Sequence, residues 1–236
     1  MKKQKGTVLN CFSPPVMIAT MVIEVSLAIY TLFRYKLGTF VKLSVLMLIG
    51  LATFQLAEFN VCQGNAAAAW SRVGFVAITA LPPLGLHMMH VLANKKAGKT
   101  VAAAYLTMLG FMVFFLTYSS AFSGHQCTGN YVIFHLSANS GGLYYAYYYG
   151  WLAAGIALGV RWAKQLLVKG KMTARLQAIQ GLIAGYLVFL IPTTVVNTLK
   201  PSTISGLPSV MCGFAVLFAL ILGFYILPRA AEHKRG

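Results

Sequence analysis

The sequence contains almost no acidic residues. Its 236 residues include three acids in total, and none of them is aspartate. Charged residues make up 9% of the chain, whereas a soluble domain usually carries about 25%. With a mean hydropathy of +0.74, this deficit excludes an ordinary soluble domain. Since no long polar block remains beside the apolar segments, we expect one membrane domain over residues 1–236.

Motifs that indicate an enzyme or a cofactor are also missing. The chain has no glycine-rich phosphate-binding loop, no Gly-x-Ser-x-Gly and no His-Glu-x-x-His. Its four cysteines are too few for a disulfide scaffold and form no Cys-x-x-Cys pair. The last apolar segment has no lysine that could hold retinal as a Schiff base. We therefore predict no catalytic residues, no cofactor and no enzyme activity.

Long apolar runs take the place of the missing charges. Seven runs of about 20 residues are each long enough to cross about 30 Å of hydrocarbon as a helix. Backbone groups in lipid must be hydrogen-bonded within a segment, and the alternation of barrel strands is missing, so we predict helices. The expected fold is an all-α seven-helix bundle, with spans at 15–33, 43–62, 73–93, 101–121, 143–163, 176–197 and 208–228.

Lysine and arginine predict how this bundle is inserted. The first, third and fifth links and the C-terminal tail carry 14 of these residues, and the remaining segments carry five. Because basic loops stay in the cytoplasm, we expect the N-terminus outside and the C-terminus in the cytoplasm. The protein would be a multi-pass protein of the inner (cytoplasmic) cell membrane. Its basic inner face would contact anionic membrane lipids and no nucleic acid.

Two acids, Glu24 and Glu58, lie inside predicted spans. A charge at mid-membrane costs roughly 2.5–3.5 kcal/mol, so such residues are usually functional, paired or protonated. Glu58 shares a helix face with Gln55 and Cys62. We interpret this face as the lining of an outward-facing pocket. The alternative is a protonated carboxyl bonded to a neighbouring helix.

Aromatic and small polar residues near the same end could complete that pocket. Residues 144–151 include five tyrosines and a tryptophan, which could instead form an interfacial aromatic belt. The threonines and the asparagine near the end of the sixth span could instead bond only to neighbouring helices. The ligand-binding candidates are Glu58, Gln55, Trp70, Tyr144, Tyr148, Trp151, Thr194 and Asn197.

Prolines mark the candidate hinges Pro82, Pro83 and Pro192. Each proline removes a backbone donor, and its ring clashes with the carbonyl one turn back, so the helix bends. The carbonyls that are left free could open a cavity or allow hinge motion. A static kink closed by packing is the alternative.

Histidine and cysteine each offer one further pair. His87 and His90, spaced i, i+3, are weak candidates for a metal or haem, since no other span holds a histidine; we predict no metal site. Cys62 and Cys127 are expected on the same outer side, where a disulfide could hold the link 122–142 across the helix ends. Two free thiols, or pairing with Cys11, are the alternatives; Cys212 is expected to be a small packing residue.

Several of these features together resemble the seven-helix sensor region of some bacterial histidine kinases and related signalling proteins. They are Glu58, the segment AWSRVGFVAITALPP at 69–83, ARLQAIQGLIAGYL at 174–187 and GLPSV at 206–210. The resemblance covers roughly 40–228 and implies an outer N-terminus and a cytoplasmic output. The sequence contains no kinase or cyclase domain, so we expect a sensor of this kind to signal through a separate partner or to be a shortened form of such a protein.

Two functions follow as expectations. The first is a receptor-like sensor module for signal transduction, which binds a small-molecule or lipid ligand from the outer side. It would signal through a protein partner in the membrane or at the cytoplasmic face, with the basic inner links presenting the changed surface. The second is a structural or accessory subunit of a larger membrane complex, in which the polar residues only join the helices.

Overall fold

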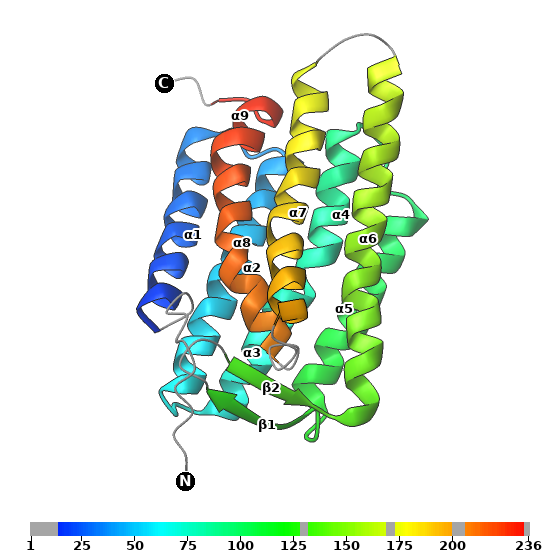
Figure 1. Ribbon diagram of the computed structural model, residues 1–236. Helices are drawn as coiled ribbons and strands as arrows, with labels where there is room; N and C mark the ends of the chain where they lie inside the picture. Colours follow the sequence, from blue (N-terminus) through cyan, green and yellow to red (C-terminus); the bar gives the residue numbers. More distant parts are fainter. Residues whose placement is uncertain (1–13, 128–131, 169–172, 200–205, 234–236) are drawn as a thin grey trace.

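The computed structural model describes residues 14–127, 132–168, 173–199 and 206–233, and it shows a bundle of long helices with a small β-hairpin at one end (Figure 1). The helices are α1 (Pro14–Arg34), α2 (Thr39–Cys62), α3 (Ala67–Thr79), α4 (Leu81–Leu92), α5 (Lys99–Thr117), α6 (Ala138–Val168), α7 (Ala174–Leu199) and α8 (Leu207–Ile221). A π-helical turn, η3 (Leu222–Ile226), and the short α9 (Leu227–Ala230) continue α8.

Six helical runs in the described residues are long and apolar enough to cross a membrane. In this respect α3 and α4 count as one run, Ala67–Leu92, and α8 to α9 count as another, Leu207–Ala230. The remaining long helix, α6, has 31 residues but does not meet the same test of composition. The chain is thus a multi-pass helical membrane protein, and the prediction of seven spans is met for six of them.

Several links are shorter than predicted, because helices extend into them. We placed Trp70 in a link at 63–72, but α3 begins at Ala67 and Trp70 lies in its first turn. The chain enters α3 through Ala66, whose φ of 42° is left-handed and turns the backbone sharply after α2. In the same way α6 begins at Ala138, five residues before the predicted span.

The link 122–142 contains a β-hairpin that was not predicted from the sequence. Strand β1 (Phe122–Cys127) pairs antiparallel with β2 (Val132–Leu136). Val132, Ile133 and Phe134 of β2 are buried, and the Phe134 ring meets the Phe75 ring of α3 at 5.3 Å between centroids. Cys127 is joined to Cys62 by a disulfide. The hairpin is therefore fixed both to the end of α2 and to the core.

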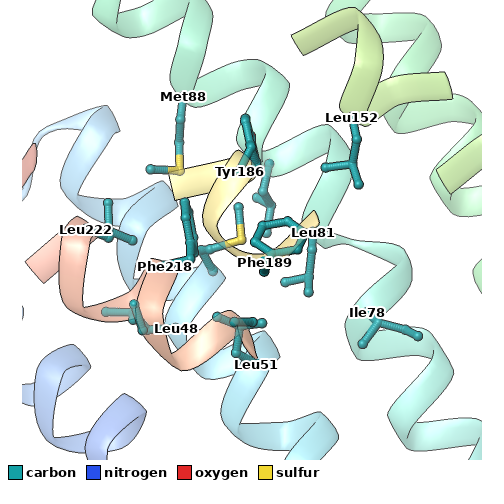
Figure 2. Close-up of a cluster of buried hydrophobic side chains, with 14 of the residues drawn as sticks. Leu48, Leu51, Ile78, Leu81, Met88, Leu152, Tyr186, Phe189, Phe218 and Leu222 are labelled. Carbon is teal, nitrogen blue, oxygen red and sulfur yellow. The ribbon is translucent and has the colours of Figure 1, made fainter. Parts of the chain in front are cut away.

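The core fills the space between α2, α4, α6, α7 and α8 (Figure 2). Tyr186 of α7 stacks on Phe218 of α8, with ring centroids 5.8 Å apart and planes 5° apart. The glycines of α7 permit this closeness, because a Cβ at Gly185 would lie 2.6 Å from the Phe218 ring and one at Gly181 would lie 2.8 Å from the Tyr225 ring. This pair of small residues thus lets α7 pack closely against α8 and η3.

The two ends of the bundle differ in charge. The hairpin end holds β1, β2, the end of α2 and the start of α8, and the opposite, basic end holds the end of α1 and the start of α7 (Figure 1). At the basic end Lys36 pairs with Glu232 at 2.9 Å, and the Tyr35 ring packs on His233. At the hairpin end Arg72 donates to backbone carbonyls at the end of α5, among them Phe115 O at 2.6 Å. This cation therefore caps a helix C-terminus, where positive charge is favourable.

Candidate functional site

The Glu58 carboxyl lies in a closed interface between α1, α2 and α8. Its side chain is 1% exposed, and the Ser209 hydroxyl of α8 donates a hydrogen bond to it. A cavity of about 10 Å³ lies beside it, lined by Glu58, Gln55, Ser209 and Thr20 together with Val16, Met17 and Gly213. We call Thr20, Gln55, Glu58 and Ser209 the carboxyl site. Since about 10–15 Å³ holds one water molecule, this cavity is too small for an organic ligand.

Polar atoms of the carboxyl site lack hydrogen-bond partners within the described residues. They are Glu58 Oε1 and Gln55 Nε2, both buried. The two carboxyl oxygens of Glu24 in α1 are likewise buried without a partner, although Glu24 does not line the cavity. Buried polar atoms are nearly always hydrogen-bonded, so each exception needs an explanation.

The predicted hinge at Pro82 and Pro83 is closed by hydrogen bonds from α6. Pro83 has no N–H, so the carbonyl of Thr79 has no helical donor four residues on. The Tyr147 hydroxyl donates to this carbonyl at 2.7 Å. The Thr79 hydroxyl donates to Phe75 O and lies 3.2 Å from the Tyr144 hydroxyl. We call Thr79, Pro83, Tyr144 and Tyr147 the kink cluster, and its contacts favour a static kink.

Tyr144 and Tyr148 of α6 point into the protein core, where the cavities beside them are too small for a ligand. Tyr144 is 1% exposed and packs among the rings of Phe75, Phe111 and Phe115. It shares a cavity of about 10 Å³ with Tyr148 and Cys212, and Tyr148 also lines a second cavity of about 20 Å³ in the core. These small, mainly apolar spaces are packing defects. The tyrosines therefore serve as core residues here.

Both candidate tryptophans lie away from Glu58. Trp151 Nε1 donates to Thr107 Oγ1 of α5 at 3.1 Å, so this side chain joins α6 to α5. Trp70 is half-buried against the core in α3 and lines neither the Glu58 cavity nor the tyrosine cavities. The prediction that both tryptophans share a pocket with Glu58 is therefore wrong in this structure.

The remaining two candidates, Thr194 and Asn197, line a larger open cavity at the hairpin end. Its volume is about 420 Å³, and it lies between α7, α6 and the start of α8. Thr194 and Thr193 bond to the carbonyls four residues back, at 2.8 and 2.7 Å. The full lining is Tyr149, Leu190, Thr193, Thr194, Asn197, Thr198 and Leu207. Pro192, the third predicted hinge, lies inside α7 next to these threonines.

The histidine pair bonds to its neighbours. His87 Nδ1 lies 3.1 Å from the Tyr105 hydroxyl of α5, and His90 Nδ1 lies 2.9 Å from Leu86 O. The His90 ring also meets the Trp162 ring edge-on, with centroids 4.9 Å apart. Within the described part of the chain, no group of three or more His, Cys, Asp or Glu side chains could hold a metal ion.

The structure thus divides the eight predicted ligand residues among several places. Glu58 and Gln55 line the closed carboxyl site, Tyr144 and Tyr148 belong to the core, the tryptophans lie apart, and Thr194 and Asn197 line the open cavity. Four residues that were not among the predicted ligand residues also contact these sites: Thr20, Tyr147, Tyr149 and Ser209. Cys11, the rival cysteine, lies outside the described residues, while Cys212 is free and buried.

No family model matches the chain, and no curated protein sequence matches it. The resemblance to the seven-helix sensor region therefore stays a prediction. The functional conclusions below depend on the chain's own geometry.

Proposed function

We propose that the protein is a receptor-like membrane sensor whose ligand site is the open cavity at the hairpin end. The carrying observation is this cavity of about 420 Å³, which falls within the 300–1,000 Å³ typical of small-molecule sites. Its lining combines Leu190 and Leu207 with hydroxyl groups and the Asn197 amide. This mixture suits an amphipathic small molecule or a lipid.

A ligand in this cavity could change how the surrounding helices pack. A ligand there would touch α6, α7 and the start of α8 at once. At the basic end α7 and α9 are joined by Arg229, whose Nε donates to Gln177 Oε1 at 3.2 Å. A shift of α7 against α8 would therefore change the surface that a cytoplasmic partner meets. Such a signal requires that the ligand bind the two arrangements with different affinity.

We further infer that α6 is the seventh span, with the N-terminus outside and the C-terminus in the cytoplasm of a bacterial inner membrane. In Figure 1 α6 runs beside α5 and α7 along the bundle. At 1.5 Å per residue its length is about 46 Å, more than the hydrocarbon needs. Cysteines introduced as Gly142→Cys and Lys164→Cys should react with an impermeant maleimide from opposite sides of the membrane. Labelling of both from one side would refute the span.

A structural or accessory subunit is the second candidate function, and the closed carboxyl site favours it. If Glu58 only joins helices, the protein needs no ligand and would be recovered within a larger complex. The two functions differ in what accompanies the purified protein. A sensor retains a small molecule in its cavity, whereas an accessory subunit retains a protein.

Native mass spectrometry of protein purified from its own membrane tests this difference. Thr194→Phe fills the cavity, and Val195→Phe places the same ring on an exposed position of the same helix. We expect a small molecule or lipid bound to the wild type and to Val195→Phe, and about tenfold less of it on Thr194→Phe. Equal occupancy of all three proteins, or a constant protein partner without a small molecule, would reject the sensor.

A further inference from the structure

The carboxyl site contains a set of polar groups that the proposed ligand cavity does not use. Glu58 Oε1 can accept a hydrogen bond and Gln55 Nε2 can donate one, and both lack partners within the described residues. Both side chains line the same cavity of about 10 Å³, together with Thr20. The Thr20 hydroxyl donates to Met17 O, which leaves its lone pairs available to a further donor.

These groups match one water molecule. Water in a protein cavity makes about three hydrogen bonds and occupies about 10–15 Å³ of such space. A water here would accept from Gln55 Nε2, donate to Thr20 Oγ1, and bond to Glu58 Oε1 as donor or acceptor. A sodium ion fits less well, because hard cations take about six or more oxygen ligands and the cavity has no room for additional waters.

The surroundings of Glu58 favour its neutral form. An unpaired carboxylate inside a membrane protein is costly unless a cation or water compensates it. The described residues of the packed elements offer no such cation: Arg34 of α1 and Lys42 of α2 lie near the basic end, and Arg72 of α3 is bound to α5 carbonyls. On the hairpin, His125 and His135 are exposed.

The titratable groups that remain near the carboxyl site are acidic. Cys212 of α8 is buried and lies within electrostatic range of both Glu58 and Glu24 of α1. The titratable side chains of α4 are His87 and His90, and both are hydrogen-bonded toward the basic end of the bundle, away from the carboxyl site. Loss of a proton from Glu58 would therefore place an unpaired negative charge beside these groups.

A hydrogen-bond chain connects this carboxyl to the hairpin. The backbone N–H of Val132, in β2, donates to Ser209 Oγ at 3.1 Å, and the Ser209 hydroxyl donates to Glu58. Cys62, one turn beyond Glu58 on α2, holds the other strand through its disulfide to Cys127. Ser209 is thus the side chain through which a rearrangement around Glu58 would reach β2.

We propose that Glu58, with Gln55 and Thr20, forms a reversible binding site for one proton and one water molecule, and that its occupancy controls how firmly β2 is held to α8. In the occupied state the carboxylic acid is neutral and the three helices close around it. When the pH rises, the O–H bond of the acid breaks, the proton passes to water, and the remaining carboxylate draws more water into the interface. The contact of Ser209 with β2 then loosens.

The scarcity of acids makes this site directly measurable. The chain has three acidic side chains, and Glu232 is exposed, so Glu24→Gln leaves Glu58 as the only buried one. Infrared spectra of Glu24→Gln in lipid vesicles should show a carboxylic acid C=O band at neutral pH that vanishes reversibly as the pH rises. The band should be missing from Glu24→Gln/Glu58→Gln. Its absence from Glu24→Gln itself at neutral pH would overturn the proposal.

Hydrogen exchange of β2 tests the link to the hairpin. Above the midpoint of the band, β2 should exchange about tenfold faster in Glu24→Gln than in Glu24→Gln/Glu58→Gln at the same pH, a change of about 1.4 kcal/mol in opening free energy. Below the midpoint the two should agree. Ser209→Ala in the Glu24→Gln background should keep the titrating band, but adding Glu58→Gln to it should no longer change the exchange of β2 at the same pH. A titrating band with unchanged β2 exchange would refute the control of the hairpin.

Discussion

The kink cluster and the carboxyl site are both polar regions inside an apolar bundle, but they differ in how their hydrogen bonds are completed. In the kink cluster the carbonyl that Pro83 leaves free is bonded by Tyr147, and the Thr79 hydroxyl has two partners. In the carboxyl site, atoms of Glu58 and Gln55 have no partner in the described residues. The first region is complete without a ligand, whereas the second has room for the one water molecule that we propose there. The hydrogen bonds of the kink cluster favour a static kink over the hinge predicted at Pro82 and Pro83.

The largest expected effect comes from disturbing the packing just after the kink. A Cβ at Gly85 would overlap the hydroxyl of the buried Tyr186, so Gly85→Ala should lower the free energy of unfolding by about 3 kcal/mol, the upper range for overpacking. Gly110→Ala on α5 meets open space and should be neutral or slightly stabilising. Thermal unfolding in detergent measures both. Adding Tyr186→Phe should restore part of the loss, and the absence of any rescue would contradict the assigned clash.

Tyr147→Phe removes the donor that completes the kink. The Thr79 carbonyl would then be buried without a partner, at a cost of about 2 kcal/mol. Tyr118→Phe, at an exposed position after α5, is the matched control and should change little. The same unfolding measurement applies. If Tyr147→Phe were as stable as the control, the kink would not depend on α6 and could act as a hinge after all.

Replacing each of the two buried glutamates should change the free energy of unfolding in opposite directions. Glu24 has two buried oxygens without partners, so Glu24→Leu should raise the free energy of unfolding by about 1 kcal/mol. Glu58→Leu should lower it by about 1 kcal/mol, because it removes the acceptor of Ser209 and leaves Gln55 facing an apolar wall. Equal effects from the two substitutions would show that the carboxyl site is no different from its surroundings.

The sequence was sufficient to predict the helices. Apolar length defines a membrane helix, so each predicted span overlaps a helical run, although helices extend into the predicted links at 67–72, 138–142 and 164–168. Cys62 and Cys127 were also placed on one side by the order of the spans, and the structure joins them. The hairpin was missed because two short strands with one buried face give a weak signal beside such long runs.

The grouping of site residues could not be predicted, because it depends on how each helix is rotated. A helix that is apolar on all sides gives no preferred buried face. Five tyrosines in six positions of α6 surround the helix, so the pattern could not show that Tyr147 meets the kink while Tyr149 faces the open cavity. Likewise nothing in the sequence of α2 and α7 showed that Glu58 and Thr194 line separate cavities.

The smallest expected effect comes from a polar contact in water, which separates the role of burial from the role of pairing. Lys36 and Glu232 are joined at 2.9 Å, yet their side chains are 55% and 79% exposed. Solvent screens such a pair, so Lys36→Ala should lower the free energy of unfolding by no more than about 0.5 kcal/mol. A double-mutant cycle with Glu232→Ala, followed by thermal unfolding at low and high salt, measures the coupling. A coupling as large as the Tyr147→Phe effect would show that pairing by itself stabilises this bundle. A small, salt-sensitive coupling would show that a polar contact contributes little to stability at the exposed surface. Burial, as in the carboxyl site, would then decide how much a polar group matters.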